Sequence, residues 1–211
     1  PKGYIYIGID SPFSVASAEN IAMTRLFVDL YTDDVIEENY DAELAGIHYH
    51  LYAHQGGMTL QVSGLSEKQG DLLAKLLESL KHHVAPQNRF ELFKKQSISH
   101  WANAEKSKSI SQLFATMSSV MQPNNLSSPR LAEALKDVTY RQFLRFSKQL
   151  FTQVTIEALV HGNWLAEHTE QISSCIKQTF DGYYRDEHEV KCPVIDIKDQ
   201  GQLILPVTLP D

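Results

Sequence analysis

Nine histidines are the residues with the most evident chemical potential in this sequence, because imidazoles are common zinc ligands. A zinc peptidase places two imidazoles one helical turn apart, with a carboxylate near the metal-bound water. His50 and His54 have that spacing, but they lie in a segment with strand periodicity, where four residues span roughly 13 Å. His48 and His50 share a strand face about 6.6 Å apart and could chelate an ion, although the sequence indicates no third ligand. We interpret these three residues as exposed or hydrogen-bonded strand histidines.

The remaining histidine pairs also lack the spacing of a metal site. His82 and His83 are consecutive, so they point to different faces of a helix, and a predicted turn separates His161 from His168. Neither H-x-x-E-H nor H-E-x-x-H occurs in the chain. The sequence therefore predicts that no residue of this chain binds a metal.

Motifs for nucleophilic or cofactor chemistry are absent from the sequence as well. It contains no G-x-S-x-G, no phosphate-binding glycine loop and no C-x-x-C. Gly56-Gly57 is typical of a hairpin turn. Asp33-Asp34 and Glu37-Glu38 fall within a predicted helix, and we interpret them as a solvated face, with a peptide or cation contact as the alternative. We predict no catalytic residue and no cofactor-binding residue.

The composition is that of an ordinary globular protein. Of 211 residues, 43% are hydrophobic and 21% are charged, which argues against disorder. The net charge of −7 lacks the basic surface that phosphate backbones require, so nucleic acid is not an expected partner. No run of 18 apolar residues is present, so we expect no membrane span. The chain starts at Pro1 without a methionine or signal peptide, which we interpret as a hint that it belongs to a longer protein.

The two cysteines leave the redox compartment open. Cys175 is spaced with Ile172, Ile176 and Phe180 on one helix face, so we interpret it as a small buried apolar residue. A disulfide bridge from Cys175 to Cys192 is the less favoured alternative.

The first third of the chain sets up the fold. Lys2–Asp10 is rich in β-formers with almost no polar interruption, which predicts a central strand covered on both faces. A helix is predicted from Ser14, its N-cap, to Gly46, with one broad apolar face. Period-two alternation then predicts a hairpin of His48–His54 and Met58–Gly64.

Later segments alternate between helical runs and one more strand. A capping box at Ser66–Gln69 opens a leucine-rich helix, and a second one at Thr139–Gln142 opens another. The further predicted elements are helical sequence over Asn88–Gln122, a loop over Gln122–Pro129, helices Arg130–Lys136 and Tyr140–Leu150, a strand Thr152–His161, a helix Leu165–Phe180 and a short strand at 203–205.

This order predicts an α+β fold, a mostly antiparallel sheet with helices packed on one face. We expect residues 1–189 to form a single α+β domain. Residues 190–211 are expected to be an extended linker or strand leading to the next domain.

Four stretches, in order, resemble the insulysin/pitrilysin family of large zinc metallopeptidases. They are Met23–Leu51, Leu60–Leu77, Leu131–Phe151 and Ile156–Trp164, so the resemblance covers nearly the whole chain. Members of this family have four similar α+β domains of the metallopeptidase LuxS/MPP-like type, arranged as two bowl-like halves around a peptide chamber. Their first domain carries the inverted zinc motif H-x-x-E-H.

The resemblance implies that this chain is the non-catalytic third, or middle, domain, which opens the C-terminal half. Zinc is then expected in the N-terminal catalytic domain of the full-length protein, since the first long helix here, Ser14–Tyr31, holds no histidine and Glu19 stands alone. The final domain of such enzymes contributes an arginine and a tyrosine, and the counterpart here, Tyr40–Tyr49, keeps Tyr49 but lacks the arginine.

The partners implied by the resemblance are other domains of the same polypeptide and a peptide substrate. A periplasmic location would follow only for a bacterial pitrilysin-like enzyme. One alternative is an inactive peptidase-like interaction or assembly subunit without a proteolytic role. Another is an unrelated enzyme that uses His48, His50 and His54.

Overall fold

The computed structural model describes residues 2–38, 45–65, 68–181, 190 and 192–194. Several predictions fall on the remaining residues and lie outside this description. They are the C-terminal part of the first long helix, Ser66 of the first capping box, most of the 190–211 linker and the strand at 203–205.

One four-stranded antiparallel sheet, in the order β2-β3-β1-β4, forms the base of the fold. Its strands are β1 (Lys2–Asp10), β2 (Ile47–Ala53), β3 (Gly57–Leu65) and β4 (Thr155–Gly162). Ile7 of β1 pairs with Leu60 on one side and Ala158 on the other, so β1 is an interior strand. The predicted α+β class and the antiparallel sheet are confirmed.

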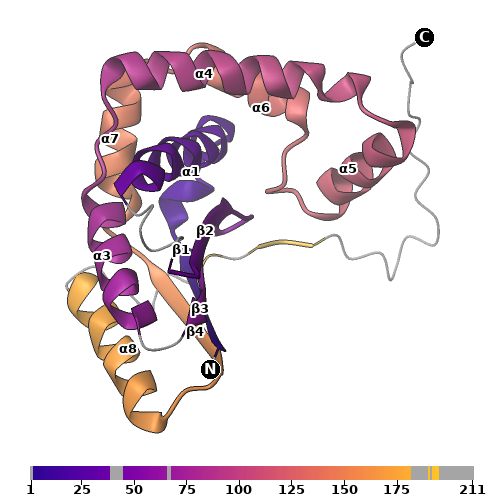
Figure 1. Ribbon diagram of the computed structural model, residues 1–211. Coiled ribbons are helices and arrows are strands. Elements are labelled where there is room, and N and C mark those ends of the chain that lie inside the picture. The colour runs from indigo at the N-terminus through magenta and orange to yellow at the C-terminus, as the bar shows by residue number, and fades with distance from the viewer. Residues whose placement is uncertain (1, 39–44, 66–67, 182–189, 191, 195–211) are drawn as a thin grey trace.

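The prediction that both faces of β1 are covered is wrong. Ile5, Ile7 and Ile9 are buried, whereas the alternating Tyr4 is exposed and Tyr6 is half-buried. Side chains alternate across a strand, and the helices lie on one face of this sheet only (Figure 1). Tyrosine and isoleucine are equally good β-formers, so the β-propensity of the strand did not distinguish the two faces.

Helix α1 (Ala18–Glu38) runs through the centre of the molecule. It begins later than predicted, because Pro12–Ser14 form a short 3₁₀ turn, η1, and the amide of Asn20 donates to Oγ of Ser17 at 3.2 Å. Ser17, not Ser14, is therefore the capping residue. Gly46, with φ of +80°, has the left-handed conformation expected where the chain turns toward β2.

The other described helices follow α1 in the chain (Figure 1). They are α3 (Gln69–His82), α4 (Gln87–Ala102), α5 (Ser109–Met121), α6 (Ser128–Lys136), α7 (Tyr140–Leu150) and α8 (Ala166–Thr179), with a short 3₁₀ helix, η3 (Asn103–Lys106), after α4. α1 contacts β2 on the sheet side, and it contacts α4, α6 and α7 on the others. Its buried residues are therefore not confined to one face: Ala22, Met23, Thr24, Leu26, Phe27, Val28, Leu30, Tyr31 and Val35.

The N-termini of α7 and α3 were both predicted to have capping boxes. The predicted capping box of α7 is confirmed, since the amide of Gln142 donates to Thr139 Oγ1 and the amide of Thr139 donates to Gln142 Oε1. Gln69, at the start of α3, is fully buried, and its side-chain amide donates to the backbone carbonyls of Gly3 and Gly64 at 2.8 Å each. Gln69 thus joins α3 to β1 and β3.

β4 is one of the two edge strands and is only partly covered. Val154, just before it, is buried, whereas Ala158 is exposed. α8 packs against α3 and leaves a groove of about 950 Å³ between itself and β4. Val84, just beyond the end of α3, is also exposed.

Candidate functional site

The face of the sheet that turns away from the helices carries a set of polar and aromatic side chains, here named the open face. Its rows follow from the strand register, in which Tyr4 pairs with Ser63 and His161, and Tyr6 pairs with Gln61 and Leu159. β2 adds the alternating residues of its outward side. The open face consists of Tyr4, Tyr6, His48, His50, Tyr52, Thr59, Gln61, Ser63, Glu157, Leu159 and His161.

Aromatic and imidazole rings lie close together on the open face. The ring centroids of Tyr4 and His161 are 6.3 Å apart, and the rings of His50 and Tyr52 stack at 5.6 Å. Phenol, imidazole and amide groups both donate and accept hydrogen bonds. This surface therefore offers hydrogen-bond donors, hydrogen-bond acceptors and ring faces to a ligand.

His48 and His50 lie on one strand face, as their spacing predicted, and both are exposed. Among the residues that the structure describes, no three side chains of His, Cys, Asp and Glu gather closely enough to hold a metal ion. The prediction that this chain binds no metal remains a prediction to be tested by metal analysis.

His54 is separated from the other two histidines and closes the β2–β3 hairpin. Its Nδ1 accepts a hydrogen bond from the amide of Gly56 at 3.1 Å, and its Nε2 lies 3.4 Å from Oδ1 of Asp10. Burial raises the pKa of Asp10, and Glu157 raises it further, while His54 opposes both. A Cβ on Gly57 would collide with the backbone carbonyl oxygen of Ile9, so this turn requires glycine at position 57. His54 has a structural role in the hairpin.

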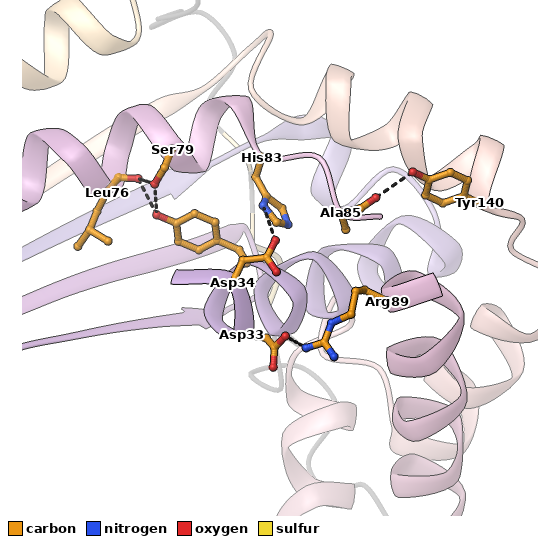
Figure 2. A network of polar contacts seen from close by, with 9 residues as sticks. Asp33, Asp34, Leu76, Ser79, His83, Ala85, Arg89 and Tyr140 are labelled. Carbon is orange, nitrogen blue, oxygen red and sulfur yellow. Dashed lines mark hydrogen bonds and ion pairs between the residues drawn. The ribbon is translucent and has the colours of Figure 1, made fainter. Parts of the chain in front are cut away.

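The two aspartates of α1 are partly exposed to solvent, as interpreted, and each also lies close to a basic side chain that the sequence did not indicate. Asp33 forms an ion pair with Arg89 of α4, and Asp34 lies 3.5 Å from Nδ1 of His83 (Figure 2). Both partners come from the segment that follows α3, which the fold brings back over α1. The side chains of Glu37 and Glu38 lie outside the described residues.

His83 is the most enclosed of these groups. Its side chain is 8% exposed and its ring makes edge contacts with Phe27 and Tyr31. Burial lowers the pKa of His83, and Asp34 partly offsets that effect. Nearby, Tyr140 of α7 donates from its hydroxyl to the carbonyl of Ala85 at 2.9 Å (Figure 2). These contacts join α1, α3 and α7 around one enclosed cluster.

The remaining predicted pairs are not brought together. His82 is exposed and pairs with Glu78 at 3.0 Å, whereas His83 points inward, as predicted for different helix faces. His168 Nδ1 accepts from the amide of Leu165 at the start of α8, and His161 lies on the open face.

Cys175 is half-buried and Cys192 is exposed, and both are free thiols rather than a disulfide. Burial raises the pKa of each thiol.

A second concave surface lies at the start of α1, where the resemblance would place the zinc motif of a catalytic domain. This cleft, of about 730 Å³, is lined by charged residues of both signs, among them Glu19, Arg130 and Arg145. Asn20 Nδ2 donates to the carbonyl of Phe13 at 2.7 Å, and Met23 is buried. The residues present do not fit a zinc ion, because no imidazole or thiol lines the described cleft and two arginines, Arg130 and Arg145, do.

Comparison with known proteins agrees with this arrangement. A family model described as the middle or third domain of peptidase_M16 matches residues 1–134. The chain belongs to the M16 peptidase family. The insulysin/pitrilysin resemblance predicted from four sequence stretches is thereby confirmed, including its assignment to the middle domain.

Relatives of this M16 domain are much longer proteins. The chain is 30% identical over 179 residues to the human insulin-degrading enzyme, covering 85% of this chain and 18% of that protein. It is 27% identical over 177 residues to the A-factor-processing enzyme of Saccharomyces cerevisiae, covering 84% and 17%. The crystal structure of pitrilysin superposes with a TM-score of 0.78 at 20% identity, covering 87% of this chain and 19% of that one. The M16 domain thus spans less than a fifth of these proteins.

Tyr49, which the resemblance matched to the tyrosine of the family's final domain, does not lie on the open face. It lies on the helix-facing side of β2, and its hydroxyl donates to the carbonyl of Val35 in α1 at 3.0 Å. Tyr49 therefore fixes β2 to α1. The open face, in contrast, was not identified from the sequence, although the alternation of Tyr4 with Tyr6 and of His48 with His50 was the available signal.

Proposed function

We propose that this chain is a non-catalytic domain of an insulysin/pitrilysin-type zinc metallopeptidase and forms part of the C-terminal half that encloses the peptide chamber. The zinc ion and the hydrolytic chemistry belong to the N-terminal catalytic domain of the longer polypeptide. The match to the family's middle or third domain carries this proposal.

The burial of α1 supports a non-catalytic role. In a catalytic domain of this family the first long helix must present metal ligands to substrate. Here that helix is enclosed by the sheet and by α4, α6 and α7, and residues such as Leu26 and Phe27 are at most 1% exposed. Many side chains of this helix are buried and stabilise the domain, and the residues that remain exposed, such as Glu19 and Ile36, include no histidine.

The open face is the part of the domain best suited to line a peptide chamber. It is flat and hydrogen-bonding, and no helix of the described residues covers it (Figure 1). The chain carries a net charge of −7, which gives basic peptides a weak electrostatic preference. Contacts of this kind hold a peptide without cutting it.

Metal and activity measurements on the purified chain test the non-catalytic role. We expect less than stoichiometric zinc by elemental analysis and no turnover of a quenched fluorogenic peptide. Stoichiometric zinc together with turnover would overturn the proposal. The variant His48→Ala/His50→Ala/His54→Ala tests the rival enzyme, which requires that any turnover be lost with these imidazoles.

Photo-crosslinking in the longer polypeptide tests the chamber role. A benzophenone amino acid replaces Tyr52 on the open face in one variant and Ile36 on α1 in the control, where the side chains are 38% and 49% exposed. With the catalytic zinc site disabled, a biotinylated basic peptide is expected to crosslink from position 52 and not from position 36. Equal crosslinking from both positions, or none, would favour the interaction or assembly subunit instead.

A further inference from the structure

Helix α5 stands apart from the rest of the domain. It lies in the connection between η3 and α6 and makes only sparse contacts with the other described elements (Figure 1). None of its 13 residues is buried. Five large apolar side chains are between 47% and 57% exposed: Ile110, Leu113, Phe114, Met117 and Met121.

These five side chains form one continuous stripe. Their spacing of three, four, seven and eleven residues from Ile110 places them on a single helix face. Elsewhere in the described part of the chain, exposed apolar residues such as Ile36, Leu65 and Val84 lie on different elements. Scattered apolar residues are normal on a protein surface, whereas a contiguous stripe marks an interaction surface.

The chemistry of the surrounding residues indicates which kind of partner fits. From Ser109 to Pro129 the sequence contains no charged residue. Helices that lie on membranes carry lysine and arginine on their polar face, and partners that associate and dissociate use charge for steering. An uncharged stripe with phenylalanine and methionine resembles the core of a permanent interface.

The segment that follows α5 is hydrogen-bonded to the core, although the apolar face of α5 is uncovered. Arg25 of α1 donates from Nη2 to Oδ1 of Asn125 at 3.1 Å, which joins the segment after α5 to the core. An isolated helix of this length is marginal in water, so its stability depends on packing. The relatives show where that packing surface can come from, because more than four-fifths of their length lies outside the matched region.

We propose that the apolar stripe of α5 packs against an apolar surface of a neighbouring domain of the same polypeptide and holds the two domains together. This inference rests on the proposed function, since it requires the longer M16 polypeptide. α5 is then an interdomain contact, and the open face remains available to peptide.

Hydrogen exchange in the longer polypeptide tests this interface. We expect amides of residues 109–121 to exchange at least about tenfold more slowly there than in the 211-residue chain. The variant Leu113→Glu/Phe114→Glu should abolish that protection and increase proteolysis between domains. Val84→Glu, at an exposed apolar residue outside α5, is the matched control. It should leave the exchange protection of residues 109–121 and the rate of proteolysis unchanged.

Three results would overturn the inference. They are equal exchange rates in both proteins, protection that rises with protein concentration and so indicates a second copy, and protection that requires phospholipid vesicles. Failure here is distinguishable from failure of the proposed function. Peptide crosslinking from position 52 with an unprotected α5 would remove the interface alone, whereas a protected α5 in a polypeptide without peptidase activity would remove the peptidase assignment alone.

Discussion

Helices α1 and α5 make an instructive contrast. α1 carries four carboxylates near its end, yet most of its surface is covered by elements of its own chain. α5 carries no charge at all, yet none of its residues is buried. Hydrophobic content alone therefore does not decide which helix is central. A helix becomes central when other elements of the chain pack against it, as α4, α6 and α7 pack against α1.

The same comparison identifies two sources of stability. The α1 region folds around contacts that the chain supplies itself, including the buried isoleucines of β1 and the leucines of α3. α5 offers apolar surface whose burial must come from outside the described residues. Mutations in the α1 region should therefore destabilise the isolated chain more than mutations in α5. In the longer polypeptide, mutations in both regions should be destabilising.

The largest expected difference in the free energy of unfolding is between alanine substitutions of two phenylalanines. Phe27 is 1% exposed on α1 and Phe114 is 57% exposed on α5. Phe27→Ala should lower the free energy of unfolding of the isolated chain by about 4 kcal/mol, because it leaves a cavity in a packed core. Phe114→Ala should change it by less than about 0.5 kcal/mol. Chemical denaturation of both variants checks this, and equal losses would mean that α5 is packed within the chain itself.

A smaller difference in the free energy of unfolding is expected when the hydroxyl groups of two tyrosines are removed. Tyr31 Oη of α1 donates to the carbonyl of Leu76 at 2.7 Å and lies equally close to Oγ of Ser79. Tyr31→Phe leaves those groups without this partner and should cost about 1 kcal/mol in the free energy of unfolding. Tyr52→Phe on the open face is the matched control and should be nearly neutral. A neutral Tyr31→Phe would show that water replaces the hydroxyl.

The smallest expected effect is the contribution of His83, which contacts α1, to the pH dependence of the free energy of unfolding. Burial lowers the pKa of His83 below its ordinary value of 6.5, so the unfolded chain binds this proton more readily than the folded one. Stability should therefore rise with pH from the lowered folded-state value up to about 6.5 and then level off, with a slope of no more than about 1.4 kcal/mol per pH unit.

Unfolding of His83→Gln across that window measures the contribution of this one side chain. The variant should lose the component of the slope that comes from His83. His82→Gln, one position earlier and exposed, is the control and should retain it. A slope that is unchanged in His83→Gln would show that other groups account for the pH dependence.

Local sequence signals anticipated the elements that depend on local physics. β1 has the predicted bounds, and the capping box at Thr139 opens α7 as expected. The β2–β3 hairpin lies within one residue of its prediction, because Gly56-Gly57 and strict alternation specify both the turn and the register.

Errors arose where distant segments meet. The basic partners of Asp33 and Asp34 were missed, because Arg89 and His83 are about fifty residues away in the sequence. Gln69 was interpreted as half of a capping box, yet its amide reaches the carbonyls of Gly3 and Gly64.

The sequence by itself determined the strand pattern, the capping box of α7 and the ordered stretches that place this chain in the M16 family, since each depends on residues near one another along the chain. The tertiary structure decided that α1 is enclosed, that Tyr49 points inward and that α5 presents its apolar stripe outward. Burial is a property of what packs against a residue, and that is set only when the whole chain has folded.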